Sequence, residues 1–531
     1  MKDTLKQLRQ SRCLPYLAAA LSFLVAWTGE TGSLVWGGLC ILLSLPLLAA
    51  PEYLLVPLLS AVLLDNNCNL LPGLTASRYF TMLFLAVEGL SVLLREKPGQ
   101  WVRRFAYPVL LILYVLVSAV FVGHCFSLDV FTFGMNIALA VLMAALPSQR
   151  RERLWRLLPW SCAAAVSYML FCLNFHEVEI DSGRYWFLGA TNVNGIGMVL
   201  AQTAILFFAA MAAQPETRKG EWKAVGCFAG YVVSLYLLIL TGARSALLGL
   251  VAGCAVLGIL LLLRSERGRG RRRQTANLAV TCCLSAVLCL TAPQLQQRVA
   301  LWQYDAAHPT PPVEEVQPDQ TETPEDTSAQ PETPEAPLED TPAQPEHPSR
   351  EETVAQLQEN TDSFWRRMNP FNAHWGGSAG RAGIWQILIE HSIKPHPLTG
   401  SGFGSAGNVL QTNGSCTSGA HNLLIAILSD LGLIGLLLFG VPLVRFLCRL
   451  LRRKDPAALL PLGMIVTGLI TGVGENVYTE RFLWYAAGLA LWRAAELFQR
   501  KRPPKAILDA WEQRCLGCNT CTFGCPAGLG M

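Results

Sequence analysis

The stretch ILTGARSALLGL, residues 239–250, places one arginine, Arg244, in the middle of an otherwise apolar run. A charged side chain at the centre of a membrane-spanning helix costs about 2.5–3.5 kcal/mol even on lenient scales. Apolar segments near the length of about 20 residues that spans a bilayer nevertheless continue on both sides of this arginine. The depth of Arg244 in the membrane therefore depends on where the membrane spans begin and end.

The composition indicates an integral membrane protein. Of the 531 residues, 52% are hydrophobic and 15% are charged, whereas soluble domains carry about 25% charged residues. We therefore predict an all-α fold, a polytopic membrane helix bundle with about 12–14 transmembrane helices. The apolar segments behind this prediction are 14–28, 33–50, 52–64, 74–94, 106–123, 127–146, 154–173, 192–213, 222–241, 244–263, 277–292, 421–444, 457–474 and 480–498.

Two features near the N-terminus allow more than one interpretation. The segments 33–50 and 52–64 contain prolines, which interrupt helices because proline has no backbone N–H. These segments fit either broken helices or re-entrant ones. The basic start of the chain also fits a signal peptide, but no clear cleavage site follows it, so we interpret residues 14–28 as a span.

The connecting segments fall into two sets that differ in charge. One set is basic, as in PSQRRERLWR at 147–156 and RSERGRGRRR at 264–273. The other is not markedly basic, as in TGA at 241–243 and GENVYTE at 474–480. Basic loops face the cytoplasm in most membrane proteins. We therefore predict a multi-pass protein of the inner membrane with both termini in the cytoplasm.

This topology divides the chain into four parts. They are the N-terminal spans at 1–292, a large extracytoplasmic loop at 293–420 between the eleventh and twelfth spans, the C-terminal spans at 421–498, and a cytoplasmic cysteine-rich tail at 499–531.

The large loop is itself of two kinds. Residues 309–352 are rich in proline, glutamate and threonine, and they cannot bury enough apolar surface to fold, so we predict disorder there. Residues 362–420 are predicted to be partly helical. Within them, Ile384, Ile387 and Leu388 follow the spacing of one apolar helical face.

The topology also explains how Arg244 is tolerated. Spans nine and ten are joined only by TGA on the outer side, so Arg244 lies at the outer mouth of span ten, where Gly242 eases the tight turn. The helix N-terminus, the Ser245 hydroxyl and the guanidinium then converge on an anion site that suits phosphate. The alternative is a helix-end arginine that reaches lipid headgroups or pairs with a carboxylate.

Other polar side chains gather at the same outer face. Taken singly, an asparagine at a helix start is commonly a cap, and a histidine there is more often a cap or surface residue than a catalyst. The glycine-rich GSGFG at 400–404 has no strand before it, which argues against nucleotide binding. Together the polar residues predict a cationic patch where the pyrophosphate of a lipid-linked sugar would lie. They are Asn192, Asn194, Arg381, Trp385, His421, Asn422, Glu475, Asn476, Tyr478 and Arg481.

The order of five segments resembles a known family. NVNG at 192–195, TGARSALLGL at 241–250, RAGIW at 381–385 and HPLTGSGFGSAGN at 396–408, followed by HNLLIAILSDLGLIGLLLF, resemble the O-antigen ligase/polymerase superfamily. The resemblance covers about residues 186–440. Ser245 stands where that family often has glycine, and the acidic insertion lengthens the outer loop. Neither departure removes a motif residue.

The resemblance implies an integral-membrane glycosyltransferase of cell-envelope biogenesis. Such enzymes move a glycan from undecaprenyl pyrophosphate to an acceptor hydroxyl on a glycan, a lipid or a protein. By the resemblance, Arg244 and Arg381 hold the donor pyrophosphate and His421 activates the acceptor, in an inverting reaction that requires no metal. Membrane lipids are expected partners and nucleic acid is not. Further substrate-binding candidates are Ser245, Asn194, Asn422 and Trp385.

The C-terminal tail carries a separate signal. Cys515, Cys518, Cys521 and Cys525 before Pro526 have the spacing of bacterial iron–sulfur sites. In two-cluster ferredoxins the fourth cysteine binds the other cluster, and this chain has no second run. An iron–sulfur cluster, a zinc ion and no ligand at all remain open, and glycosyl transfer needs none of them.

Two other function classes compete with glycosyl transfer. A transporter or flippase of lipid-linked or anionic substrates would place its polar residues near the bilayer midplane, often on repeated halves, whereas here they crowd the outer face. A membrane redox protein built on the tail would lack paired intramembrane histidines for haem. The sequence leaves open whether the enzyme is a polymerase or a ligase, and whether Cys68, Cys125 and Cys416 form a disulfide.

Overall fold

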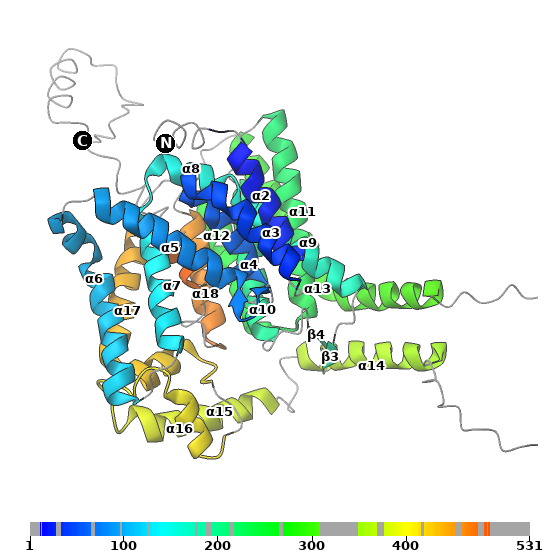
Figure 1. Ribbon diagram of the computed structural model, residues 1–531. Coiled ribbons are helices and arrows are strands. Elements are labelled where there is room, and N and C mark those ends of the chain that lie inside the picture. Colours follow the sequence, from blue (N-terminus) through cyan, green and yellow to red (C-terminus); the bar gives the residue numbers. More distant parts are fainter. Residues whose placement is uncertain are drawn as a thin grey trace, which may run out of the picture.

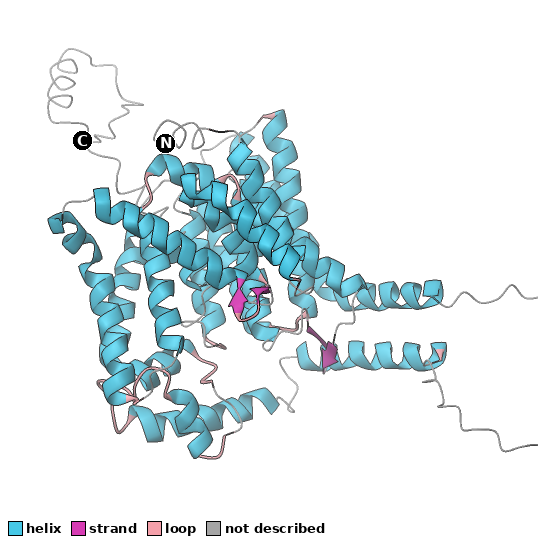
Figure 2. Ribbon diagram, viewed as in Figure 1, coloured by secondary structure: helices cyan, strands magenta, loops and turns pink. Residues whose placement is uncertain are grey.

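The structure is a computed structural model, and it describes residues 11, 13–27, 33–64, 69–95, 98–124, 128–175, 179–181, 183–186, 193–212, 217–264, 269–307, 349–368, 376–415, 419–451, 459–475, 483–485 and 487–488. Helices make up almost all of this described chain, and its strands form two short antiparallel pairs (Figure 2). The predicted all-α membrane helix bundle is therefore confirmed.

Eight of the described helices are long and apolar enough to cross a membrane, and five further apolar helices are shorter. The predicted span at 480–498 falls almost wholly outside the described residues. In chain order the helices are α2 (Cys13–Trp27), α3 (Leu34–Ser44), η1 (Leu45–Ala49), η2 (Pro51–Leu54), α4 (Leu55–Leu63), α5 (Ala76–Arg95), α6 (Pro98–Val117), η3 (Ser118–Val122), α7 (Leu128–Ala145), α8 (Ser148–Trp155), α9 (Leu158–Phe175), α10 (Val193–Ala212), α11 (Arg218–Leu240), α12 (Arg244–Arg264), α13 (Arg269–Ala307), α14 (Arg350–Met368), α15 (Gly376–Leu388), η5 (Ile389–Ile393), α16 (Ala406–Thr412), α17 (Leu423–Leu451) and α18 (Leu459–Gly472).

The proline-containing segment near the N-terminus is a broken helix. α3 ends at Ser44, and the two short 3-10 helices η1 and η2 precede α4. Pro46 and Pro51 stand at the starts of η1 and η2, where a missing N–H removes no helical hydrogen bond. The helix is interrupted there, and whether the segment is re-entrant in the membrane stays a prediction. Every residue of α4 is buried, so this segment lies in the core.

Small residues bring α12 and α18 into close contact. A Cβ on Gly249 or Gly253 would collide with Thr467 or Thr471 of α18, which shows how nearly the two backbones approach. Small side chains allow this kind of packing between helices in membranes, where van der Waals contact replaces the hydrophobic driving force. The contact positions the C-terminal end of α18 beside the N-terminal end of α12.

α13 and α14 run side by side away from the bundle (Figure 1). The sequence predicted a loop from residue 293, but α13 continues through Pro293 to Ala307. Hydropathy marks where the apolar surface ends, and a helix need not end there. The large loop therefore begins with helix.

The predicted disordered insertion ends earlier than expected. Residues 308–348 lie outside the described residues, so the prediction of disorder stays a prediction for them. Arg350 to Glu352, by contrast, form the first turn of α14. Ser349 and Glu352 cap this turn reciprocally: Glu352 N–H donates to Ser349 Oγ at 3.2 Å, and Ser349 N–H donates to Glu352 Oε2 at 2.8 Å.

The two strand pairs lie at turns between helices. β1 (Asn69–Leu71) pairs with β2 (Leu74–Thr75), in the register Asn69 opposite Thr75. β3 (Glu179–Asp181) pairs with β4 (Arg184–Trp186), in the register Ile180 opposite Tyr185. Gly183 in the second hairpin has a φ of 72°, and a Cβ there would lie 2.5 Å from the backbone nitrogen of Phe364 in α14. The hairpin therefore packs tightly on α14.

Candidate active site

The turn between α11 and α12 holds the arginine motif. α11 ends at Leu240 and α12 begins at Arg244, so the connection has the three residues that the sequence predicted. Gly242 adopts a φ of 60°, which glycine takes without steric cost. Arg244 and Ser245, both partly exposed, therefore stand in the first turn of α12.

The NVNG segment packs directly on this turn. Gly197 of α10 has no room for a Cβ, which would overlap the Ala243 side chain and lie 3.2 Å from Thr241 Oγ1. Asn194, three residues earlier, accepts a hydrogen bond from Arg184. Asn194 thus stabilises the turn from the side, and its amide oxygen already has a partner within the protein.

Arg184 is a residue whose importance the sequence did not reveal. It lies in β4, is 8% exposed, and donates from Nε to the carbonyl oxygen of Thr241 at 2.9 Å. Its aliphatic stem lies against Gly242, where a Cβ would be 3.2 Å from Arg184 Cγ. Burial also raises the pKa of the adjacent Tyr185 to about 12. One indication of its importance was present in the sequence, which is that Arg184 lies in a connecting segment of the set that is not markedly basic.

A buried carboxylate connects two of the predicted site residues. Glu475 is 4% exposed and follows the end of α18. Its Oε1 accepts a hydrogen bond from Arg381 Nη2 at 3.4 Å, and its Oε2 lies 3.3 Å from His421 Nδ1. The arrangement brings together side chains from α15, from the start of α17 and from the end of α18, which are separated in the sequence.

Gly474 places the arginine motif against the same cluster. A Cβ on Gly474 would lie 2.8 Å from Ser245 Cβ, 3.1 Å from Ser245 Oγ and 3.5 Å from Arg381 Nη1. Ser245 and Arg381 therefore meet across this glycine. The close packing of α12 and α18 produces the meeting, because it holds residue 474 at the first turn of α12.

The backbone around His421 is unusual. His421 has a φ of 46°, a left-handed conformation that non-glycine residues adopt rarely and that is found at functional sites. Asn422 caps α17: its Oδ1 accepts from the N–H groups of Leu424 and Ile425 at 3.0 and 3.1 Å. Its Nδ2 donates to the carbonyl of Val473 at 3.1 Å. Asn422 thus has the structural role that is common for asparagine at a helix start.

Trp385 also makes a structural hydrogen bond. Its indole N–H donates to the carbonyl of Ala420 at 2.8 Å, directly before His421. The predicted apolar face of α15 is confirmed, because Ile384 and Leu388 are 8% and 0% exposed. α15 is therefore anchored to the core on one side and to the His421 segment on the other.

Comparison with known proteins finds similarity over part of the chain. A family model described as O-antigen ligase matches residues 229–440. A curated O-antigen ligase of Pseudomonas aeruginosa is 31% identical over 126 residues, which are 22% of this chain and 31% of that protein. Residues 229–440 of the chain are therefore similar to the O-antigen ligase family. The match spans less than a third of the relative's length.

The O-antigen ligase region contains only part of the cluster. Arg244, Arg381 and His421 lie within residues 229–440, whereas Glu475 and Arg184 lie outside them. The Asn194 segment, which the resemblance included, also lies upstream of the matched region. Tertiary structure therefore adds a carboxylate that the family motifs did not include.

The glycine-rich segment of the O-antigen ligase region has a structural role. α17 is interrupted at Gly432, which has a φ of 62°. The N–H groups of Leu433 and Ile434 donate at 2.9 and 3.1 Å to the carbonyls of Pro397 and Leu398, and Ser401 N–H donates to the Ser429 carbonyl at 2.8 Å. The HPLTGSG loop thus supplies the hydrogen bonds that the break removes from α17.

Several sequence-based candidates are not placed. Their residues lie outside the part of the chain that the structure describes, so the predicted metal site on the tail and the outer disulfides stay predictions. These residues are Asn192, Asn476, Tyr478, Arg481, Cys68, Cys125, Cys416, Cys515, Cys518, Cys521 and Cys525.

Proposed function

We propose that this chain is a membrane glycosyltransferase that moves a glycan from an undecaprenyl-pyrophosphate carrier to an acceptor hydroxyl in surface polysaccharide assembly. One observation carries the proposal: the Glu475 carboxylate lies within 3.3 Å of His421 and 3.4 Å of Arg381. The carboxylate thus connects a histidine, which can accept a proton, to an arginine, which can bind an anion. The similarity of residues 229–440 to the O-antigen ligase family supports a role in membrane glycan transfer.

The two arginines are the proposed binding groups for the donor pyrophosphate. The Arg381 side chain is 35% exposed, and Arg244 is partly exposed at the start of α12. Guanidinium groups and the free N–H groups of a helix start stabilise the negative charge that builds on a departing pyrophosphate. Ser245, beside Arg381 at Gly474, adds a hydroxyl donor to this binding site.

His421 is the proposed base. Because its Nδ1 faces Glu475, the carboxylate favours the tautomer with hydrogen on Nδ1 and leaves the lone pair of Nε2 for the acceptor. As the acceptor oxygen bonds to the anomeric carbon, its proton passes to Nε2. The bond from that carbon to the pyrophosphate breaks, and its electron pair stays on the carrier. One such displacement inverts the anomeric configuration and requires no metal.

Glu475 links the two halves of this reaction. One carboxylate oxygen faces the arginine that binds the donor, and the other faces the histidine that activates the acceptor. The carboxylate therefore sets the relative position of the donor and acceptor sites. Holding reacting groups in register supplies a large part of the rate enhancement in group transfer.

We place this site at the extracytoplasmic face of the inner membrane, with both termini in the cytoplasm. The support is the basic character of the opposite loops. α8, which carries four arginines from Arg150 to Arg156 within and just after it, lies at the end of the bundle away from α15 and α16 (Figure 1). Basic segments of this kind stay on the cytoplasmic side.

The experiment is a profile of undecaprenyl-linked glycans in cells that carry only the His421→Ala protein. Accumulated single repeat units indicate a polymerase, and accumulated long lipid-linked chains indicate a ligase. His396→Ala is the matched control, because His396 is exposed and has no role in the proposed reaction. A wild-type profile from normally expressed His421→Ala would remove His421 as the base and reopen the transporter interpretation.

A further inference from the structure

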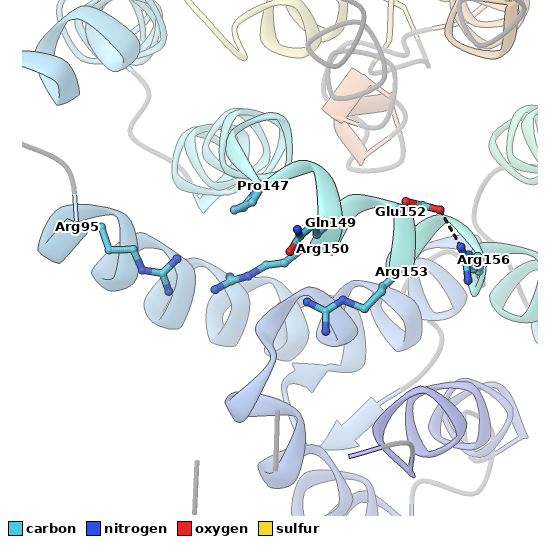
Figure 3. Close-up of a pocket in the computed structure, with 7 residues that line it drawn as sticks. All are labelled: Arg95, Pro147, Gln149, Arg150, Glu152, Arg153 and Arg156. Atoms are coloured by element: carbon cyan, nitrogen blue, oxygen red, sulfur yellow. Dashed lines mark hydrogen bonds and ion pairs between the residues drawn. The ribbon is translucent and has the colours of Figure 1, made fainter. Parts of the chain in front are cut away.

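A pocket of about 670 Å³ lies between the C-terminal end of α5 and the α8 segment (Figure 3). α8 is at the end of the bundle opposite α15 and α16 (Figure 1). The pocket is lined by four arginines, Arg95, Arg150, Arg153 and Arg156, and by none of the residues assigned to glycan transfer. Its chemistry therefore needs its own explanation.

Two buried carboxylates hold the inner arginines in place. Glu88 of α5 is 2% exposed and accepts a hydrogen bond from Arg150 Nη1 at 3.0 Å. Glu52 of η2 is 0% exposed and lies 3.3 Å from Arg153 Nη2 and 3.9 Å from Arg150 Nε. A buried ion pair costs several kcal/mol of desolvation for each ion. These ion pairs lie beneath an open pocket, and we interpret them as contacts that orient the guanidinium groups of Arg150 and Arg153.

Arg95 faces these oriented groups. Figure 3 shows its side chain directed across the pocket toward Arg150. Arg156, at the other end of the lining, pairs with Glu152 at 2.7 Å, and both of these side chains are largely exposed. Among the described residues, these four arginines meet three carboxylates that pair with Arg150, Arg153 and Arg156, so the excess positive charge lies at Arg95, which faces Arg150. Two guanidinium groups that face each other are stabilised by an anion between them.

The neighbouring surface of α5 indicates where such an anion comes from. Leu90, Leu93 and Leu94 are 57%, 57% and 78% exposed, directly before Arg95. In a membrane bundle such leucines contact acyl chains. Basic pockets between helices at the cytoplasmic side of membrane proteins bind phosphate headgroups, and the planar fork of arginine matches phosphate oxygens.

We propose that this pocket binds a phosphate group, with Arg95 and Arg150 as its principal ligands and the headgroup of an anionic phospholipid as the source that the adjoining leucines favour. A soluble phosphate compound has the same chemistry at the arginines and lacks the acyl contact. The site is separate from the proposed donor site, so it does not depend on the proposed function.

The test is native mass spectrometry of the full chain in detergent. The probes are phosphatidylglycerol and a diacylglycerol with the same acyl chains, which has no phosphate. Arg95→Gln removes the charge that faces Arg150 without changing a buried ion pair, and Arg445→Gln, at an exposed position of α17, is the matched control. Phosphatidylglycerol is expected to bind about tenfold more weakly to Arg95→Gln, as for the loss of one charged hydrogen bond. Binding to Arg445→Gln and binding of diacylglycerol should not change.

Titration with inorganic phosphate separates the two sources. Binding of inorganic phosphate at millimolar concentration that Arg95→Gln abolishes, without specific binding of phosphatidylglycerol, would identify a soluble ligand at the same arginines. Equal binding of phosphatidylglycerol to wild type, Arg95→Gln and Arg445→Gln, with no phosphate binding, would overturn the proposal. Thermal denaturation of each variant shows that the comparison is between folded proteins.

Discussion

Glu475 Oε2 lies 3.3 Å from His421 Nδ1, although α17 and α18 separate the two residues in the sequence. The Glu475 side chain is 5% exposed, and a buried carboxylate is retained when it has charged or hydrogen-bonding partners. Its other partner is Arg381. The buried carboxylate, the partly exposed histidine and the arginine form one unit at the outer end of the proposed topology.

Glu475→Gln is the sharpest test of that unit. The amide keeps the size of the side chain but offers an N–H to His421 Nδ1, which favours the wrong tautomer. We expect the rate of glycan transfer to fall by about 10²- to 10⁴-fold with a smaller change in the KM for the donor. The measurement is steady-state transfer by purified protein. Glu390→Gln, at an exposed glutamate of η5, should keep the wild-type rate; equal rates for both variants would contradict the role of Glu475.

Gly474→Ala tests the contact between the arginine motif and the cluster. The new Cβ would lie 2.8 Å from Ser245 Cβ but 3.5 Å from Arg381 Nη1, so Ser245 must shift away from its place beside Arg381. Because displacement of reacting groups by about 1 Å costs about 10²-fold in rate, we expect a loss of about ten- to a hundredfold in transfer at normal expression. Gly383→Ala, where a Cβ would meet no atom within 4 Å, is the control. A fully active Gly474→Ala protein would show that this contact does not matter.

Arg184→Lys tests the support of the α11–α12 turn. Lysine keeps the charge but loses the fork that reaches both Thr241 and Asn194. The expected cost is about 1.5–3 kcal/mol for each charged hydrogen bond lost, seen as a lower midpoint of thermal denaturation in detergent. Arg218→Lys, at the exposed start of α11, should leave the midpoint unchanged. An unchanged midpoint for Arg184→Lys would show that the turn holds its shape without this arginine.

Removal of residues 309–348 tests whether the acidic insertion takes part in transfer. Arg350 Nε donates to Asp305 Oδ1 at 2.7 Å, so the two ends of the insertion lie close enough for a short Gly/Ser linker. An exposed ion pair of this kind contributes little to stability. We therefore expect unchanged transfer and a nearly unchanged denaturation midpoint. Loss of transfer in a folded protein would assign the insertion a function, for example in acceptor binding.

Much of the site was predictable residue by residue. The turn at 241–243 followed from the order of apolar segments, and the helix around Ile384 followed from its periodicity. Arg381, His421 and Ser245 were named from motifs, and the structure brings all three around Gly474 and Glu475. Asn194, Asn422 and Trp385 were predicted to bind substrate, which stays a prediction, and in the structure each forms a hydrogen bond with a neighbouring part of the protein.

The role of Glu475 was not predictable in the same way. The sequence placed it among several polar residues of one connecting segment, with no spacing that joined it to His421 or Arg381. The juxtaposition depends on how closely α18 approaches α12 through Gly249 and Gly253. The sequence also did not reveal the role of Arg184, because the short hairpin that positions it has little signal in the local sequence.

The sequence by itself determined the membrane class, the helical segments, the three-residue turn before Arg244 and the family motifs. It could do so because each spanning segment must satisfy its own backbone hydrogen bonds and present its own apolar surface to lipid, which are properties of contiguous residues. Only the tertiary structure decided which side chains meet. Helix contacts in a membrane depend on detailed packing of small residues, so the meeting of Glu475, His421 and Arg381, and the pocket around Arg95 and Arg150, became visible only once the helices were in place.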